Sequence, residues 1–155
     1  MTVPPIPSDY PRLTPYLSVD GAAAAIAFYA SVLGARPRGE RMTMPDGRIG
    51  HAELAFGDAL VMLADADPES GFPAPAQAGG APVTLHLYVD DVDAVFAAAL
   101  EAGAEQIAPV ATQFYGDRSG RLRDPWGHHW NVASHVEDVT GDEMARRRRE
   151  AFGGA

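Results

Sequence analysis

The sequence contains no cysteine among its 155 residues. This absence excludes disulfide bonds, thiolate nucleophiles and cysteine-ligated metals, so any metal site would have to use histidine and carboxylate side chains. Positive charge is also scarce, because 12 basic residues face 21 acidic ones and the formal net charge is −9. The phosphates of nucleic acids and the surface of an anionic membrane repel an acidic protein, so we expect neither as a partner.

Long hydrophobic runs are missing as well. None approaches the roughly 20 residues that a membrane helix needs. Residues 1–12 lack the basic and apolar regions of a secretory signal and hold four prolines, which predicts an extended arm and a cytoplasmic protein. The apolar share of 46% is that of an ordinary globular chain, and the length is enough for one domain with a hydrophobic core.

Residues 13–64 have the pattern of a strand, a helix and three further strands. Apolar and polar residues alternate strictly over 13–19, which is typical of a half-buried strand. Asp20 is a candidate N-cap for the helix that follows, and Gly34 suits the end of that helix. The expected elements are a strand at 13–19, a helix at 22–33 and strands at 38–44, 48–56 and 59–64.

The same order returns after residues 65–82, a stretch rich in proline, glycine and alanine that predicts a linker. Val19 matches Val89 and Gly34 matches Gly103, so the period is 69 to 70 residues and the chain is a tandem duplication. The expected elements of the second copy are an alternating strand at 83–89, a helix at 91–102 capped by Asp91, and strands near 106–112, 120–124 and 128–135.

We therefore predict a single α+β domain built from two strand-helix-strand-strand-strand units. Thr140 and Glu143 have the spacing of a capping box, which predicts a helix near the C-terminus. The expected segments are an arm at 1–12, a first unit at 13–64, a linker at 65–82, a second unit at 83–135, and a C-terminal helix and tail at 136–155.

Several short segments within residues 13–135 resemble the vicinal-oxygen-chelate superfamily, the fold of glyoxalase I, the bleomycin-resistance proteins and certain dioxygenases. Within it, the segments starting at His51, Val61 and Arg121 look like the PhnB-like branch. The segments that carry the resemblance are Ser18-Val-Asp20, Ile26-Ala-Phe-Tyr29, Gly50-His-Ala-Glu-Leu54, Val61-Met-Leu-Ala-Asp65 and Arg121-Leu-Arg-Asp-Pro-Trp-Gly-His128.

The resemblance implies that each unit curls its mixed sheet into half of a cup, with the helices on the convex face and the ligand inside. It also implies a homodimer, because family members commonly pair. Alternation along the strands independently predicts which side chains pack against the helices: Leu13, Leu17, Val19, Val83, Leu85, Leu87, Val89, Trp130 and Val132.

Enzymes that this chain resembles hold one divalent cation with four side chains, usually His, Glu or Gln. The matching positions here carry two hydroxyls, a thioether and an amide, and none of them is anionic. Such groups bind a hard divalent cation poorly. We therefore predict no metal, no other cofactor and no catalytic residue at these positions, which are Thr14, Met62, Thr84 and Asn131.

The preferred hypothesis is a metal-free protein that binds a small, partly apolar or planar molecule. Sequestration of an antibiotic-like compound or a planar metabolite is the analogy that the resemblance offers, and fold alone does not establish it. The predicted ligand-binding residues are Thr14, Tyr16, His51, Glu53, Met62, Thr84, His86, Tyr88, Arg121, His129 and Asn131.

Two alternatives stay open. A displaced site made of His51, Glu53, His86 and His129 would support a metal-dependent lyase, isomerase or dioxygenase. A chain with a non-functional pocket would instead serve as a dimeric interaction module. Arg121 has two readings of its own, recognition of an anionic ligand or an ion pair within the protein.

Overall fold

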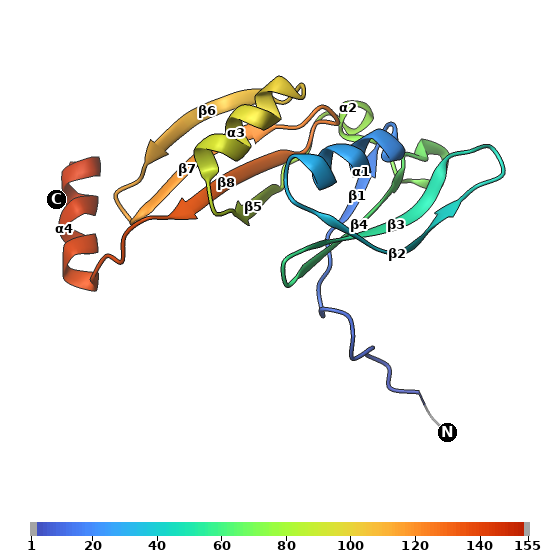
Figure 1. The fold of residues 1–155 in the computed structure, drawn as a ribbon, viewed down its shortest axis with the longest axis horizontal. Coiled ribbons are helices and arrows are strands. Elements are labelled where there is room, and N and C mark those ends of the chain that lie inside the picture. Colours follow the sequence, from blue (N-terminus) through green and yellow to red (C-terminus); the bar gives the residue numbers. More distant parts are fainter. Residues whose placement is uncertain (1–2, 154–155) are drawn as a thin grey trace. The chain divides into compact units, whose positions relative to one another are not determined.

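The computed structural model describes residues 3–153 and divides into two compact units, Met1–Gly80 and Ala81–Ala155 (Figure 1). Each unit holds a four-stranded mixed sheet and a helix that packs on one face of it. The predicted α+β class is therefore confirmed. Among residues 3–153, no helix is long and apolar enough to cross a membrane.

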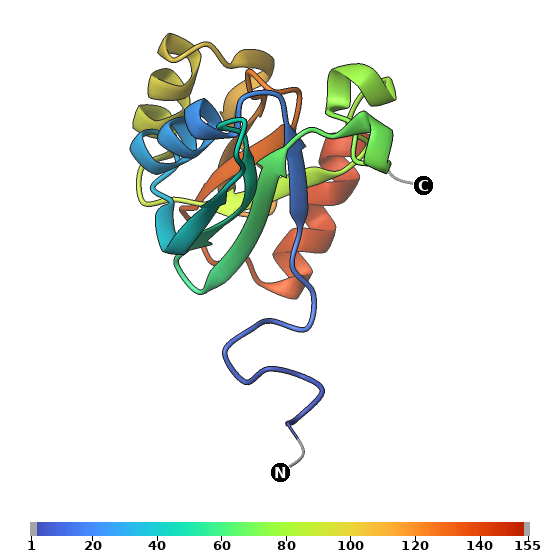
Figure 2. The ribbon, with the colours of Figure 1, turned by 90° about the vertical axis from the view of Figure 1, so that its right-hand side faces the viewer.

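Unit 1 has the strand order β1-β4-β3-β2. Strand β1 runs parallel to β4, and the other neighbours are antiparallel. Residues 3–15, which precede β1, form neither helix nor strand, as the prolines predict (Figure 2). The elements are β1 (Tyr16–Val19), α1 (Ala22–Ser31), β2 (Arg36–Thr43), β3 (Ile49–Phe56), β4 (Ala59–Asp65), the 3-10 helix η1 (Pro68–Ser70) and α2 (Pro75–Ala78).

Unit 2 repeats this topology with the order β5-β8-β7-β6, and β5 is parallel to β8. A longer helix follows the last strand. The elements are β5 (Thr84–Tyr88), α3 (Val92–Glu101), β6 (Glu105–Thr112), β7 (Asp117–Arg123), β8 (His129–His135) and α4 (Gly141–Phe152).

The core of each unit lies between its sheet and its helix. In unit 1, Val19, Leu54 and Leu63 are fully buried on the side of α1. In unit 2, Leu122 and Val132 are fully buried on the side of α3. Burying one such side chain contributes roughly 1.5–3 kcal/mol. We call the opposite side of each sheet its open face.

Two of the predicted helix-facing residues are exposed, and three more, Leu85, Leu87 and Val89, are half-buried. Leu13 is 87% exposed and Val83 is 66% exposed. Both precede the strands, because β1 begins at Tyr16 and β5 begins at Thr84. The alternation of the sequence thus extends beyond the residues that pair, and the prediction was wrong for these two positions.

Helix α1 is not capped by Asp20 as expected. Gly21 occupies the N-cap position with a φ of 103°, a left-handed conformation that suits glycine. The Asp65 carboxylate, at the end of β4, accepts hydrogen bonds from Gly21 N at 3.0 Å and Ala22 N at 2.8 Å. Its other oxygen accepts from Ile49 N at 2.7 Å, so one carboxylate joins α1, β3 and β4.

Residues 65–82 are more ordered than a linker. They contain η1 and α2, and each begins with a proline in its first turn. Asp67 and Phe72 pair as an isolated antiparallel bridge. The Gln77 side chain accepts a hydrogen bond from Ala74 N at 2.9 Å. The composition of this stretch did not predict η1 and α2, because short proline-initiated helices have no long periodicity.

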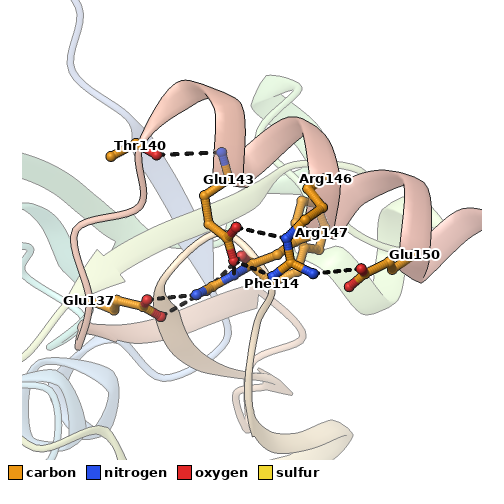
Figure 3. A network of polar contacts seen from close by, with 7 residues as sticks. All are labelled: Phe114, Glu137, Thr140, Glu143, Arg146, Arg147 and Glu150. Carbon is orange, nitrogen blue, oxygen red and sulfur yellow. Dashed lines mark hydrogen bonds and ion pairs between the residues drawn. The ribbon is translucent and has the colours of Figure 1, made fainter.

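Helices α3 and α4 are capped at the predicted residues, Asp91 and Thr140. The Glu143 carboxylate, however, bonds to Arg146 and Arg147 on the next turn (Figure 3). Arg147 also forms two hydrogen bonds to Glu137, each 2.7 Å long. These contacts join α4 to the segment that follows β8.

Candidate functional site

A cavity in unit 1 has a volume of about 490 Å³. Tyr16 and Ala64 reach it from the open face of the sheet, where they lie on β1 and β4. Aromatic, thioether and aliphatic side chains dominate its wall. The lining residues are Tyr16, Met42, Met44, Arg48, Ile49, Gly50, Ala64, Asp65, Asp67, Ser70 and Phe72.

Gly50 makes room for the two methionines of this wall. A Cβ atom at Gly50 would lie 2.6 Å from Met42 Cε and 2.8 Å from Met44 Sδ. Both thioethers therefore rest directly on the backbone of β3. Methionine is flexible and polarizable, so such a wall adapts to the shape of an apolar ligand.

Phe72 brings the supposed linker into the cavity. Its ring stands edge-on to Tyr16, with centroids 5.3 Å apart and an interplanar angle of 84°. Ser18 Oγ donates a hydrogen bond to the Phe72 carbonyl at 3.0 Å. The sequence analysis missed Phe72, Met42 and Met44, and only their apolar character within polar segments could have indicated them.

The charged residues at the cavity edge are occupied by structural contacts. Arg48 Nε donates to Asp46 at 2.8 Å, and this hydrogen bond holds the pKa of Asp46 below its ordinary value. Asp67 accepts from Ser70 Oγ at 2.7 Å, and Asp65 caps α1. The cavity is thus suited to bind an apolar body rather than to supply free charge.

Three predicted residues of the open face form one hydrogen-bonded chain. Tyr16 Oη lies 2.6 Å from His51 Nδ1, and His51 Nε2 lies 3.2 Å from Glu53 Oε1. With Glu53 ionised, neutral His51 donates from Nε2 and accepts the Tyr16 hydroxyl proton at Nδ1. Burial raises the pKa of Tyr16, and the charge of Glu53 raises it further.

The N-terminal arm completes this chain. Tyr10 Oη donates to Glu53 Oε1 at 2.7 Å, and the Arg38 guanidinium stacks 4.5 Å above the Tyr10 ring. Arg38 also forms ion pairs with Asp9 at 3.1 Å and with Glu53 at 3.5 Å. Burial opposes ionisation of Glu53, but hydrogen bonds from Tyr10 and His51 outweigh it and lower its pKa.

The open face of unit 2 carries a second polar group. The Asn131 amide lies 2.8 Å from His86 Nδ1, and the His86 and Tyr88 rings are 4.7 Å apart. Tyr88 Oη donates to the buried Asp117 carboxylate at 2.7 Å, and His135 Nδ1 lies 2.8 Å from its other oxygen. Burial works against ionisation of Asp117, yet these two hydrogen bonds lower its pKa.

Strand pairing places the remaining predicted residues. Met62 lies between Tyr16 and Glu53 in unit 1. In unit 2, Thr84 pairs with His129, and Asn131 lies between His86 and Arg121. Thr14 precedes β1. The role of each residue in ligand binding remains a prediction.

The four positions at which the superfamily holds a metal do not fit a hard divalent cation. Thr14 and Thr84 offer neutral hydroxyls, Met62 a soft thioether and Asn131 an amide that is hydrogen-bonded to His86. Within each unit, residues 3–153 include no group of three or more histidines and carboxylates that could hold a metal ion. These four positions therefore do not support a metal-dependent reaction step.

Comparisons with known proteins extend this description. The chain is similar to uncharacterized protein Mb0911c of Mycobacterium bovis, with 44% identity over 137 residues, 86% of this chain and 90% of the relative. The structure is similar to that of TioX from Micromonospora sp. ML1, with 26% identity and a TM-score of 0.61, covering 82% of this chain and 100% of that one.

The PhnB protein from Bacillus cereus shares the fold, with 18% identity and a TM-score of 0.62 over 80% of this chain and 99% of that one. Residues 12–132 match the family model of the Glyoxalase/Bleomycin resistance protein/Dioxygenase superfamily. This match covers most of the chain and confirms the resemblance read from the sequence. The chain therefore belongs to the Glyoxalase/Bleomycin resistance protein/Dioxygenase superfamily.

Proposed function

We propose that the protein binds a small, planar and partly apolar molecule in the cavity of unit 1 and holds it without a metal ion. The observation that carries this proposal is the cavity itself. Its volume of about 490 Å³ lies in the range of ordinary ligand sites, roughly 300–1,000 Å³. Sequestration in the cytoplasm would be the biological outcome.

The wall of the cavity favours a flat ligand. Tyr16 and Phe72 meet edge-to-face, so an aromatic ligand ring finds both an edge and a face to pack against. Met42 and Met44 add thioether contacts, each worth about 0.3–1.5 kcal/mol with an aromatic ring. The Tyr16 hydroxyl, held by His51, supplies a directional polar contact.

A thermal-shift screen tests the binding part of this proposal. A ligand that binds only the native state raises the melting temperature, and the gain in stability grows with the logarithm of the ligand concentration over its Kd. We expect planar aromatic compounds to raise it, and Tyr16→Ala and Phe72→Ala variants to lose that response. A melting temperature that no compound of a broad natural-product panel changes would favour the interaction-module alternative.

The second candidate is the metal-dependent enzyme, and the 3.2 Å approach of His51 to Glu53 is the observation in its favour. Plasma mass spectrometry of protein purified without a histidine tag distinguishes the two. Our proposal expects less than about 0.1 transition-metal ion per chain, well below the one ion that a dedicated site holds. Stoichiometric Ni, Zn, Mn or Fe that disappears in a His51→Ala variant would support the enzyme instead.

We also propose that two copies of the chain form a homodimer, as family membership supports. Sedimentation velocity of untagged protein tests it directly. A single species with twice the mass of the chain is expected, and a monomer at all concentrations would exclude the dimer. Neither nucleic acid nor membrane enters the proposal, because the net charge of −9 disfavours both.

A further inference from the structure

The open face of unit 2 carries an arginine without a partner at the centre of its sheet. Arg121 on β7 lies beside Asn131 on β8, and His86 on β5 follows in the same row. Among residues 3–153, no group accepts a hydrogen bond from the exposed Arg121 side chain.

Comparison with unit 1 shows why this arginine has no ion-pair partner. Arg121 occupies the place that Glu53 occupies in unit 1, because both pair with equivalent residues of the last strand. In unit 1, Arg38 of β2 lies directly opposite Glu53 and forms an ion pair with it. In unit 2, β6 places Ala108 opposite Arg121. At this position unit 2 therefore has a positive charge where unit 1 has a negative one, and the neighbouring strand of unit 2 has no opposite charge.

The other arginines of β7 are occupied. Arg118 forms two hydrogen bonds to Asp93, each 2.7 Å long, and Arg123 forms an ion pair with Glu105. Only Arg121 of the three retains its hydrogen-bond donors for an external acceptor.

Asn131 and His86 add polarity beside the guanidinium. When the Asn131 amide donates to His86 Nδ1, at 2.8 Å, neutral His86 carries its proton on Nε2. That N–H is then a second donor in the same row as Arg121. Two carboxylates lie near this row and both are engaged: Asp117 is buried and hydrogen-bonded to Tyr88 and His135, and Glu105 forms an ion pair with Arg123.

Tyr88 supplies an apolar wall. Its hydroxyl reaches Asp117 on β7, and β8 lies between β5 and β7 in the sheet. The phenol ring must therefore cross β8 at Ala133, which pairs with Tyr88 and is fully buried. Tyr88 as a whole remains 57% exposed, and its ring lies beside that of His86.

We propose that Arg121, Asn131, His86 and Tyr88 form a binding site for a small aromatic carboxylate. The planar guanidinium matches a carboxylate with two parallel hydrogen bonds, and the ring of the ligand packs against Tyr88. This site lies wholly within unit 2 and does not depend on the cavity of unit 1.

Titration with benzoate, followed by amide and side-chain NMR shifts, tests the site in the intact chain. Benzamide, which has the same shape and no charge, and acetate, which has no ring, are the comparison probes. We expect benzoate to shift the signals of Asn131, His86 and Arg121 and to bind more tightly than either comparison probe.

An Arg121→Gln variant should weaken benzoate binding by about tenfold or more, because hydrogen bonds to charged groups are lost. Arg123→Gln removes the same charge from the same strand and should leave the affinity unchanged, since Arg123 is bound to Glu105. Both variants should melt like the wild type and keep the cavity response of unit 1. Equal binding of benzoate and benzamide, or equal losses in the two variants, would overturn the site.

Discussion

The shape of the cavity depends on the absence of a side chain at Gly50. Its missing Cβ lets Met42 and Met44 lie on β3, and the atoms that a Cβ would displace are the flexible ends of those side chains. The fold therefore tolerates a methyl group here, whereas the cavity does not.

We predict that Gly50→Ala pushes the methionines into the cavity and weakens binding of a neutral aromatic probe, N-phenyl-1-naphthylamine, by about tenfold. Overpacking of this kind costs roughly 1–3 kcal/mol in a rigid core and less where side-chain ends can move. Fluorescence titration measures the affinity. Gly141→Ala is the control, because a Cβ there meets no atom within 4 Å. An affinity that is unchanged in Gly50→Ala would show that the probe does not bind in this cavity.

His135 and Asp117 make stability depend on pH in opposite directions. Hydrogen bonding to Asp117, and then to Asp138, raises the pKa of His135, so its contribution is complete below the ordinary value of 6.5 and is lost as pH rises through the folded pKa. The pKa of Asp117 is lowered, so its contribution is complete above 3.8 and is lost as pH falls through the folded value.

The contribution of His135 and Asp117 to the free energy of unfolding should therefore be largest between about pH 4 and 6.5. Urea unfolding between about pH 2 and 9 measures the profile, because the acid-side loss lies below the ordinary Asp pKa of 3.8. His135→Gln should remove the decline on the alkaline side and reduce the decline on the acid side, because the hydrogen bond with His135 is the largest contribution that lowers the pKa of Asp117. A variant whose alkaline slope equals that of the wild type would show that another group is responsible.

At the scale of elements, Asp65 joins three of them. One carboxylate accepts backbone hydrogen bonds from the start of α1 and from β3. We predict that Asp65→Ala lowers the free energy of unfolding by about 2–4 kcal/mol, since capping and charged hydrogen bonds are lost together. Asp20→Ala, which removes the acid nearest in sequence to the helix start, should change it by less than about 0.5 kcal/mol.

Chemical denaturation of the two variants measures both values. Similar losses of unfolding free energy in Asp65→Ala and Asp20→Ala would show that Asp20 also caps α1.

Helix α4 has no fully buried residue; polar contacts hold it together with an edge-on contact between Phe152 and Phe114. Arg147 bonds to Glu137, to Glu143 and to the Phe114 carbonyl (Figure 3). Arg147→Gln should speed amide hydrogen exchange in residues 141–152 severalfold, because few apolar contacts remain to protect the helix. Arg148→Gln on the exposed side is the matched control, and equal exchange in both variants would contradict this role of Arg147.

At the scale of the whole molecule, the duplicated topology could be predicted because its signals are local. Alternation along β1 and β5 and the Asp91 cap each act over a few residues. The contacts that shape the candidate site act over long distances in the chain. Ser18 binds Phe72 across 54 residues, and Tyr10 binds Glu53 across 43.

A strand pattern shows which face Glu53 occupies but not that an N-terminal arm covers it. The composition of residues 65–82 likewise gave no sign that Phe72 lines a cavity. Arg121 is a similar case. Its correspondence to Glu53 in the other unit predicts the face of the sheet on which it lies. That no counter-charge lies opposite it could not be predicted, because this depends on the register between β6 and β7.

The central claim is that the cavity of unit 1 binds a planar ligand without a metal ion. A crystal structure of untagged protein saturated with a brominated aromatic ligand, recorded with anomalous data at the bromine and transition-metal edges, tests it most directly. The account predicts a bromine peak against Tyr16, Phe72 and Met42 and no metal peak beside His51 and Glu53. A metal peak at those two residues, with the ligand bound to it, would contradict the account.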